Sequence, residues 1–97
     1  MGPMRDPLLD DAAITAALAT LPGWARTGNE IEKTYECVSF PAAISFVVGI
    51  GFAAEAADHH PDLDIRWRRV RVALTTHDSG GLTERDVALA RTIEGIA

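Results

Sequence analysis

The chain of 97 residues is long enough for one domain and too short for two. Its composition, 47% hydrophobic and 24% charged, is typical of a soluble globular protein. The net charge of −5 argues against non-specific binding to nucleic acid or anionic membranes, and the single cysteine, Cys37, excludes an internal disulfide and a cysteine-rich zinc module.

Residues 1–7 lack the charged-then-apolar order of a signal peptide, and we expect them to be a disordered or vector-derived lead. The longest nearly apolar run, residues 40–54, is shorter than the roughly 20 residues that a membrane-spanning helix needs. We therefore expect residues 8–97 to form a single domain of a cytoplasmic protein that binds neither membranes nor nucleic acid.

The first predicted element is a helix over residues 11–21. Apolar side chains recur at helical spacing from Ile14 to Leu21, an aspartate can cap the first turn, and Pro22-Gly23 ends the segment. Such a helix has one narrow apolar face to lay on the rest of the domain.

A β-hairpin is predicted next, with strands over residues 24–27 and 30–38. Gly28-Asn29 suits the tight turn between them, because both residues tolerate positive φ. In the second strand apolar and polar side chains alternate, apart from Lys33. The apolar set is Ile31, Tyr35 and Cys37, and the polar set is Glu32, Thr34 and Glu36. The hairpin should therefore be half-buried.

The longest predicted helix begins after Ser39, a suitable N-cap, and ends before Pro61. One apolar stripe on it consists of Phe40, Ile44, Val47, Val48 and Gly51. Other positions are also apolar until Glu55, and a helix that is apolar almost all round is buried on both sides. Because the chain is short, the second side is most simply covered by another subunit, which predicts a homo-oligomer.

After Pro61 the apolar pattern returns to period two and changes parity at Arg68-Arg69, which predicts a second hairpin with a tight turn or a bulge there. Residues 78–81 form a loop. Thr83 then caps a final helix, with Asp86 completing a capping box. The order helix, two strands, helix, two strands, helix predicts an α+β fold with an antiparallel sheet and helices on one face.

The three histidines are the main candidates for chemistry. His59 and His60 end the long helix, where the helix dipole favours an imidazolium, and Glu55 lies one helical turn before His59. His77 ends the last strand. Since histidine titrates near neutral pH, these groups can donate or accept protons under physiological conditions.

Other kinds of site fit the sequence less well. Three imidazoles can bind zinc, but neighbouring residues seldom both face one ion, so we expect no metal. Cys37 is predicted to lie in a strand, which argues against nucleophilic catalysis, and Gly80-Gly81 lacks the lysine of a phosphate-binding loop. The arginines within residues 66–71 are expected to pair with glutamates across the sheet rather than to bind nucleic acid.

One set of spacings resembles a known family. The segment Glu55-Ala-Ala-Asp-His-His-Pro61 is followed by Trp67, His77 and Asp86, with five, nine and eight residues in the intervals. This pattern resembles the signature of the pterin-4a-carbinolamine dehydratases, also called 4a-hydroxytetrahydrobiopterin dehydratases. The resemblance runs from Trp24 to the C-terminus and is strongest from Glu55 to Asp86.

The resemblance implies a four-stranded antiparallel sheet with three helices on one face, assembled into homodimers or homotetramers. It also implies dehydration of 4a-hydroxytetrahydrobiopterin to quinonoid dihydropterin, with no metal or organic cofactor. The usual role of that reaction is tetrahydrobiopterin recycling after an aromatic amino acid hydroxylase has used the cofactor.

The family's motif also implies roles for individual residues. His59, His60 and His77 match catalytic histidines, and we favour His60 and His77 as the acid–base pair. Glu55 and Asp86 match supporting positions, although Asp86 also fits a purely architectural cap. The implied substrate-binding set is Asp58, His59, His60, Pro61, Thr75, Thr76, His77 and Asp78.

Some points of this interpretation stay open, both for single residues and for the function. Trp67 fits the core or the pocket wall equally well, and Ala56 stands where the family often has lysine. A non-catalytic scaffold that binds a protein partner through its helical face is the alternative function, and an enzyme acting on another pterin or small heterocycle is a third.

Overall fold

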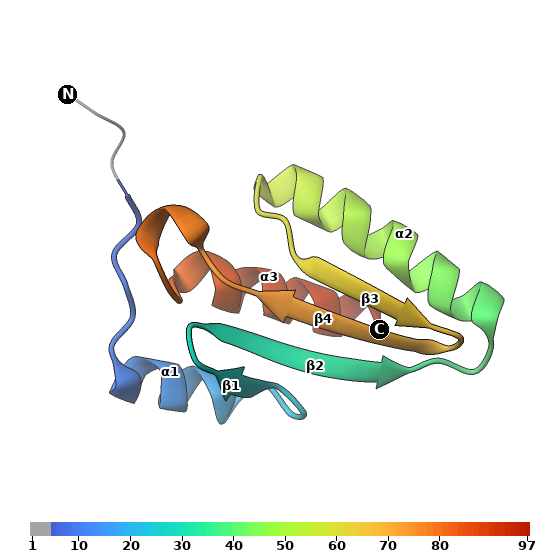
Figure 1. The fold of residues 1–97 in the computed structure, drawn as a ribbon, viewed down its shortest axis with the longest axis horizontal. Coiled ribbons are helices and arrows are strands. Elements are labelled where there is room, and N and C mark those ends of the chain that lie inside the picture. Colours follow the sequence, from blue (N-terminus) through green and yellow to red (C-terminus); the bar gives the residue numbers. More distant parts are fainter. Residues whose placement is uncertain (1–4) are drawn as a thin grey trace.

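A computed structural model describes residues 5–97 of the chain. The helices are α1 (Asp11–Leu18), α2 (Phe40–Ala57) and α3 (Glu84–Ile96), and the strands are β1 (Ala25–Thr27), β2 (Glu30–Glu36), β3 (Asp62–Arg66) and β4 (Arg69–Leu74). A short 3-10 helix, His77–Ser79, links β4 to α3. The predicted order of helices and strands and the α+β fold are both confirmed (Figure 1).

Within the described residues, the strands form one antiparallel sheet in the order β1-β2-β4-β3. The two central strands are β2 and β4, and Ile31 of β2 lies opposite Leu74, the last residue of β4. The helices cover one face, and the other face carries ion pairs such as Arg71 with Glu32, as predicted for the arginines. This register brings the end of β4 beside the starts of β2 and β3. Segments distant in sequence therefore meet at one end of the sheet (Figure 1).

The second hairpin is confirmed, but its turn lies one residue earlier than predicted. Arg66 pairs with Arg69, so Trp67 and Arg68 form the turn. Trp67 has a φ of 54°, a left-handed conformation that its residue type does not favour. Its side chain is 69% exposed at the opposite end of β4 from His77. Trp67 is therefore part of neither the core nor the end of the sheet where His77 lies.

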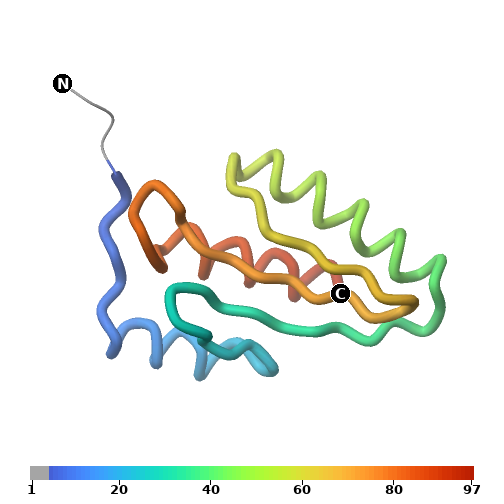
Figure 2. The backbone as a smooth tube through the Cα atoms, viewed as in Figure 1, coloured from blue at the N-terminus to red at the C-terminus, as the bar shows by residue number. Residues whose placement is uncertain are grey.

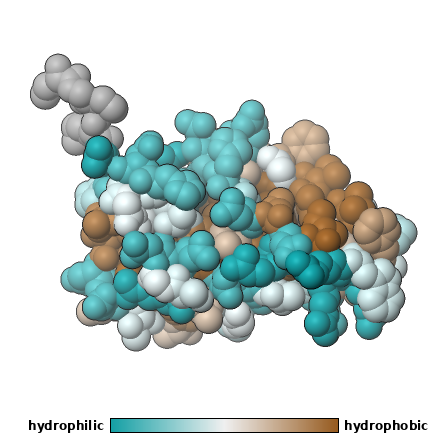
Figure 3. All heavy atoms as spheres, in the orientation of Figure 1, coloured by the Kyte–Doolittle hydropathy of each residue, from teal (hydrophilic) through white to brown (hydrophobic). Residues whose placement is uncertain are grey.

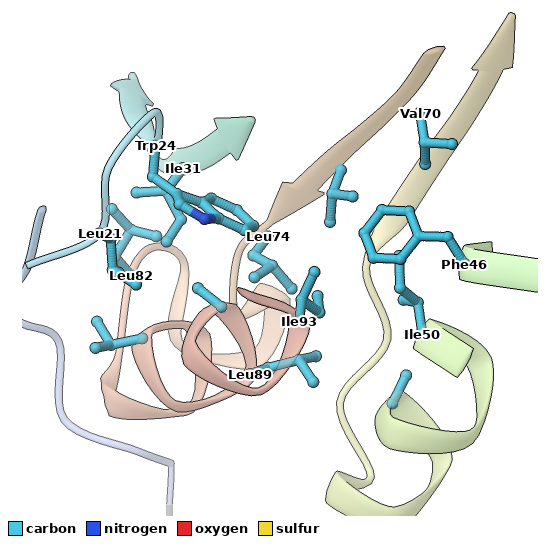
Figure 4. Packing of buried hydrophobic residues seen from close by; sticks show 14 of the residues in the cluster. Leu21, Trp24, Ile31, Phe46, Ile50, Val70, Leu74, Leu82, Leu89 and Ile93 are labelled. Carbon is cyan, nitrogen blue, oxygen red and sulfur yellow. The ribbon is translucent and has the colours of Figure 1, made fainter. Parts of the chain in front are cut away.

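Helix α2 packs on the core of this chain with one of its two apolar sides. Its residues Ala43, Phe46, Ile50 and Ala54 are buried in the core (Figure 4). The predicted stripe faces mainly outward, since Phe40, Ile44, Val48 and Gly51 are exposed and Val47 is half-buried. Because both sides of this helix are apolar, periodicity did not indicate which one faces the core. Burial of the other side by a second subunit stays a prediction. Figure 3 shows hydrophobic side chains gathered where α2 lies in Figure 1.

By length and hydropathy alone, α2 could also cross a membrane. In this fold, however, one side of it packs against the sheet and α3. The other side of α2 is both apolar and exposed, as the surface of a membrane-spanning helix is.

The N-terminal segment runs past the loop that follows β4 (Figure 2). The backbone N–H of Leu9 donates to the carbonyl of Leu82 over 2.9 Å, and the Ser79 hydroxyl donates to the carbonyl of Asp6 over 2.7 Å. Of the predicted lead over residues 1–7, residues 1–4 lie outside the described part of the chain. The segment from Asp6 onward thus braces the His77 loop.

Candidate active site

The candidate site lies at the end of the sheet where β4 finishes. The end of α2, the end of β4 and the start of α3 meet there, although 27 residues separate the hydrogen-bonded His59 and Asp86. They enclose an open pocket of about 210 Å³. Its lining consists of Asp58, His59, His60, Thr75, Thr76, His77, Asp78 and Arg85. Three histidines from two segments therefore share one pocket.

A left-handed residue at the end of α2 separates the two neighbouring histidines. Asp58 has a φ of 48° and a ψ of 44°, which ends the helix, and the N–H of His59 returns to the carbonyl of Ala54 over 3.1 Å. Beyond this turn the chain is no longer helical, so His59 points into the protein and His60 toward solvent. Only 7% of His59 is exposed, whereas 60% of the His60 side chain is.

His59 is held by a fully buried carboxylate. Its Nε2 lies 2.6 Å from Oδ1 of Asp86, whose side chain is 0% exposed. The other oxygen of Asp86 accepts from the Thr83 N–H over 2.9 Å and from the Thr76 hydroxyl over 2.8 Å. The first of these bonds is part of the predicted capping box, which is confirmed. Because its oxygens are all used, Asp86 fixes the ring of His59 in one orientation.

Glu55 pairs with a different histidine from the one that helical spacing suggested. Its Oε1 lies 2.9 Å from Nε2 of His60, and the pair is largely exposed. Helical spacing would have placed Glu55 beside His59, but the left-handed Asp58 breaks the helical phase between them. An exposed pair of this kind contributes little to stability, so its effect is on the orientation of His60.

His77 enters the pocket from the loop after β4. It is exposed and begins the 3-10 helix, which Gly80 ends with a φ of 77°. The N–H of Thr76 donates to the carbonyl of Gly81 over 3.0 Å, which closes the loop at its base. The loop that carries His77 is therefore braced at its base by backbone bonds and from outside by Asp6.

Arg85 is the one lining residue to which sequence reasoning assigned no role. Its guanidinium donates to the backbone carbonyls of Asp58 and, over 3.4 Å, Ala57, and so ties the start of α3 to the end of α2. Its position next to Asp86 was the available indication of a role at the site. A hydrogen bond to backbone carbonyls does not depend on the residue types that supply them, so it cannot be predicted from a sequence pattern. Pro61 adjoins the pocket without being among its lining residues.

No cluster of three His, Cys, Asp or Glu side chains suited to a metal ion occurs within residues 5–97. What the arrangement offers chemically is a set of imidazoles, two of them with carboxylate partners, around a cavity open to small molecules.

A protein-family model described as pterin 4 alpha carbinolamine dehydratase matches residues 7–96 of the chain. The chain belongs to this family. It is 59% identical over 88 residues to a protein of Roseiflexus sp. (strain RS-1), covering 91% of this chain and 95% of the relative. A protein of Nocardia farcinica (strain IFM 10152) is 53% identical over 94 residues, with 97% and 99% covered. Both are named provisionally as pterin-4-alpha-carbinolamine dehydratases.

Solved structures agree with this membership. A protein of Brucella melitensis described as a transcriptional coactivator/pterin dehydratase superposes with a TM-score of 0.91 at 32% identity, covering 94% of this chain and 99% of that chain. A pterin dehydratase-like RuBisCO assembly factor of the alpha-carboxysome superposes with a TM-score of 0.67 at 19% identity, covering 77% and 89%. The second likeness concerns the fold alone.

Proposed function

We propose that this member of the dehydratase family converts 4a-hydroxytetrahydrobiopterin to quinonoid dihydropterin by histidine acid–base catalysis, without metal or organic cofactor. The observation that carries the proposal is the convergence of His59, His60 and His77 on one pocket. The family model over residues 7–96 supports the reaction type. In a cell, the activity would serve tetrahydrobiopterin recycling in the cytoplasm.

The reaction requires two proton transfers at adjacent ring atoms, one to the hydroxyl on C4a and one from the nitrogen bonded to C4a. The C4a–O bond breaks as the departing hydroxyl is protonated to water, and a ring nitrogen loses a proton as the new C=N bond forms. His60 and His77 are the exposed imidazoles of the pocket, so they can reach a substrate that enters from solvent. Each proton transfer of this kind contributes roughly 10²–10⁴-fold to the rate.

His59 has a supporting part in this mechanism. Because Asp86 holds its Nε2, any exchange of a proton with the substrate runs through Nδ1. Asp58, Pro61, Thr75, Thr76 and Asp78 complete the proposed binding set, with backbone groups available to the amino and oxo edge of the pterin.

Stopped-flow measurement of 4a-hydroxytetrahydropterin dehydration tests the proposal. We expect His60→Ala and His77→Ala each to lower the rate at least about tenfold without changing oligomer size. Arg66→Ala, which alters an exposed residue at the far end of β3, is the matched control and should retain the wild-type rate. A wild-type protein that does not accelerate the reaction over buffer would remove the enzyme proposal.

A scaffold is the second candidate, and the outward face of α2 is the observation that favours it. Phe40, Ile44, Val48 and Phe52 are between 38% and 76% exposed along one helix. Such a face suits another protein surface, and we propose a second copy of this chain, as a homodimer or homotetramer, as its first occupant. An inactive protein that forms a stable complex through this face would favour the scaffold.

A further inference from the structure

The segment over residues 6–9, which precedes α1, contacts two elements of the histidine pocket through Asp6. The backbone carbonyl of Asp6 accepts from the Ser79 hydroxyl over 2.7 Å. Its carboxylate Oδ2 lies 3.5 Å from the guanidinium of Arg85. Ser79 ends the 3-10 helix that His77 begins, and Arg85 lines the pocket. One residue outside the pocket therefore contacts both the loop that carries His77 and the start of α3.

The guanidinium of Arg85 extends this connection to the end of α2. Its Nη1 faces Asp6, while its Nη2 donates to the backbone carbonyls of Asp58 and, over 3.4 Å, Ala57. A cation is favourable at the C-terminus of a helix, because the last carbonyls have no partner within the helix and carry partial negative charge. Arg85 is thus fixed from two sides, by the carbonyls of α2 and by a carboxylate before α1.

The bond from Arg85 falls on the residue whose conformation separates the two neighbouring histidines. Asp58 is left-handed, with a φ of 48°, and a residue other than glycine keeps this conformation only where its surroundings hold it. The hydrogen bond to the Asp58 carbonyl is one such hold. If Asp58 rotated, His59 would leave Asp86 and His60 would turn with it. The orientation of both imidazoles therefore depends on Arg85.

The same segment fastens the loop after β4 at further points. The Leu9 N–H donates to the carbonyl of Leu82 over 2.9 Å. A Cβ placed on Gly81 would lie 3.1 Å from Cδ2 of Leu8, so the segment packs closely against the base of the loop. Together with the bond from Ser79, these contacts hold the loop at its 3-10 helix and at its base.

We propose that residues 6–9 form a strap that positions the histidines of the pocket. Asp6 acts on His77 through Ser79 and on the histidines after α2 through Arg85. The proposal rests on the proposed function, since the positions of these imidazoles affect turnover only if they act in catalysis. Asp6, Ser79 and Arg85 are positioning residues in this assignment, because they bind the polypeptide and not the substrate.

Amide hydrogen exchange of the full chain tests the positioning without turnover. The His59 amide donates to the carbonyl of Ala54, and the Gly80 amide donates within its loop. We expect Arg85→Met, which keeps the length of the side chain and removes its donors, to speed exchange at His59 at least about fivefold. Ser79→Ala should do the same at Gly80. Each variant should leave the other amide within about twofold of wild type.

Arg91→Met is the matched control. It makes the same change on α3, where the guanidinium of Arg91 donates to the Thr20 hydroxyl over 2.9 Å and lies outside the lining of the pocket. Exchange at His59 and Gly80 should be the same in this variant as in wild type, and so should turnover. Thermal melting of each variant checks that the fold is retained.

Stopped-flow kinetics with 4a-hydroxytetrahydropterin measure the effect on catalysis. We expect Arg85→Met to lower kcat about tenfold and Asp6→Asn about two- to threefold, with KM within about twofold of wild type in both. The double variant should be no slower than Arg85→Met alone, because the carboxylate of Asp6 acts through the guanidinium. Simple multiplication of the two single effects would contradict that order of action.

The outcomes separate the strap from the proposed function. Faster exchange at the expected amides together with a lower kcat and an unchanged KM supports the proposal. If Arg85→Met raises KM and keeps kcat, Arg85 binds the substrate and is not a positioning residue. If neither amide exchanges faster, the strap holds nothing, although the dehydratase proposal stands. A wild type that does not accelerate dehydration overturns the proposed function and with it the catalytic role of the strap, whatever the exchange rates.

Discussion

Helix α3 carries one carboxylate near each end that accepts several hydrogen bonds, Asp86 near the start and Glu94 near the finish. Asp86 in the first turn is fully buried, and its two oxygens share three partners: His59 after α2, Thr76 after β4 and the N–H of the N-cap Thr83. Glu94 in the last turn is 28% exposed, and it directs a single oxygen to every one of its partners. Those partners are Trp24 at 2.8 Å, Lys33 at 2.5 Å and Tyr35 at 2.7 Å.

The difference between the two clusters lies in what their partners touch. Asp86 binds His59, which lines the histidine pocket, so a change at Asp86 reaches the site directly. None of the partners of Glu94 lines that pocket, and the cluster instead joins the first hairpin to α3. A dense set of hydrogen bonds therefore does not identify a functional site, whereas a bond to a pocket-lining imidazole points to one.

The largest effect is expected from Asp86→Asn. The change removes a buried charge that accepts three hydrogen bonds, so the free energy of unfolding should fall by about 1–3 kcal/mol. Because His59 loses its fixed orientation, kcat should fall at least about tenfold. Urea unfolding and the stopped-flow assay measure the two effects. Unchanged turnover in a folded variant would show that Asp86 acts only as a helix cap.

Glu94→Gln should change stability and leave activity alone, with a loss of about 1–2 kcal/mol at pH 7 and kcat/KM within about twofold of wild type. Burial by itself raises the pKa of Glu94, but hydrogen bonds from Lys33, Tyr35 and Trp24 outweigh it and hold the pKa below its ordinary value of 4.5. The carboxylate therefore stabilises the fold above pH 4.5, and this contribution is lost as the pH falls through the lowered pKa. Unfolding at a series of pH values from 7 to 3 checks this, because the gap between wild type and variant should narrow as the pH falls.

Tyr35→Phe should have the smallest effect, about 0.5–1 kcal/mol at pH 7, since one hydrogen bond to Glu94 is lost. Burial, followed by the bond to Glu94 and its negative charge, raises the pKa of Tyr35 above its ordinary value of 10.0. The neutral phenol therefore stabilises the fold below pH 10, and that contribution is lost as the pH rises further. Wild type should lose stability above pH 10 more steeply than Tyr35→Phe, and parallel curves in urea unfolding would contradict this.

Much of the fold could be predicted because its signals are local. Thr83 and Asp86 predict a capping box within four residues, and Gly28-Asn29 predicts the turn of the first hairpin. Both were confirmed close to where they were expected. Lys33, the exception on the apolar face of β2, was explained only by the structure. Its ammonium group reaches Glu94, 61 residues away.

The parts that could not be predicted depend on contacts between distant residues or on rare backbone conformations. The residue types of Asp58 and Trp67 did not predict their left-handed conformations. The conformation of Asp58 determines that Glu55 pairs with His60 rather than with His59. The hydrogen bonds from Arg85 to backbone carbonyls likewise form only when α2 and α3 are packed side by side. The sequence did indicate which histidines to consider, and their convergence required the register of the sheet.

The left-handed turn at Asp58 has a consequence for how this chain can vary in length. Adding or removing one residue between Ala57 and Pro61 would rotate the following side chains, so that the imidazole now held by Asp86 would be exchanged for its neighbour or lost. In the loop after Asp78, a Cβ added at Gly80 would meet no atom within 4 Å, but the φ of 77° there would strain any other residue. We therefore expect the pairing of His59 with Asp86 to fix the number of residues between the end of α2 and Pro61.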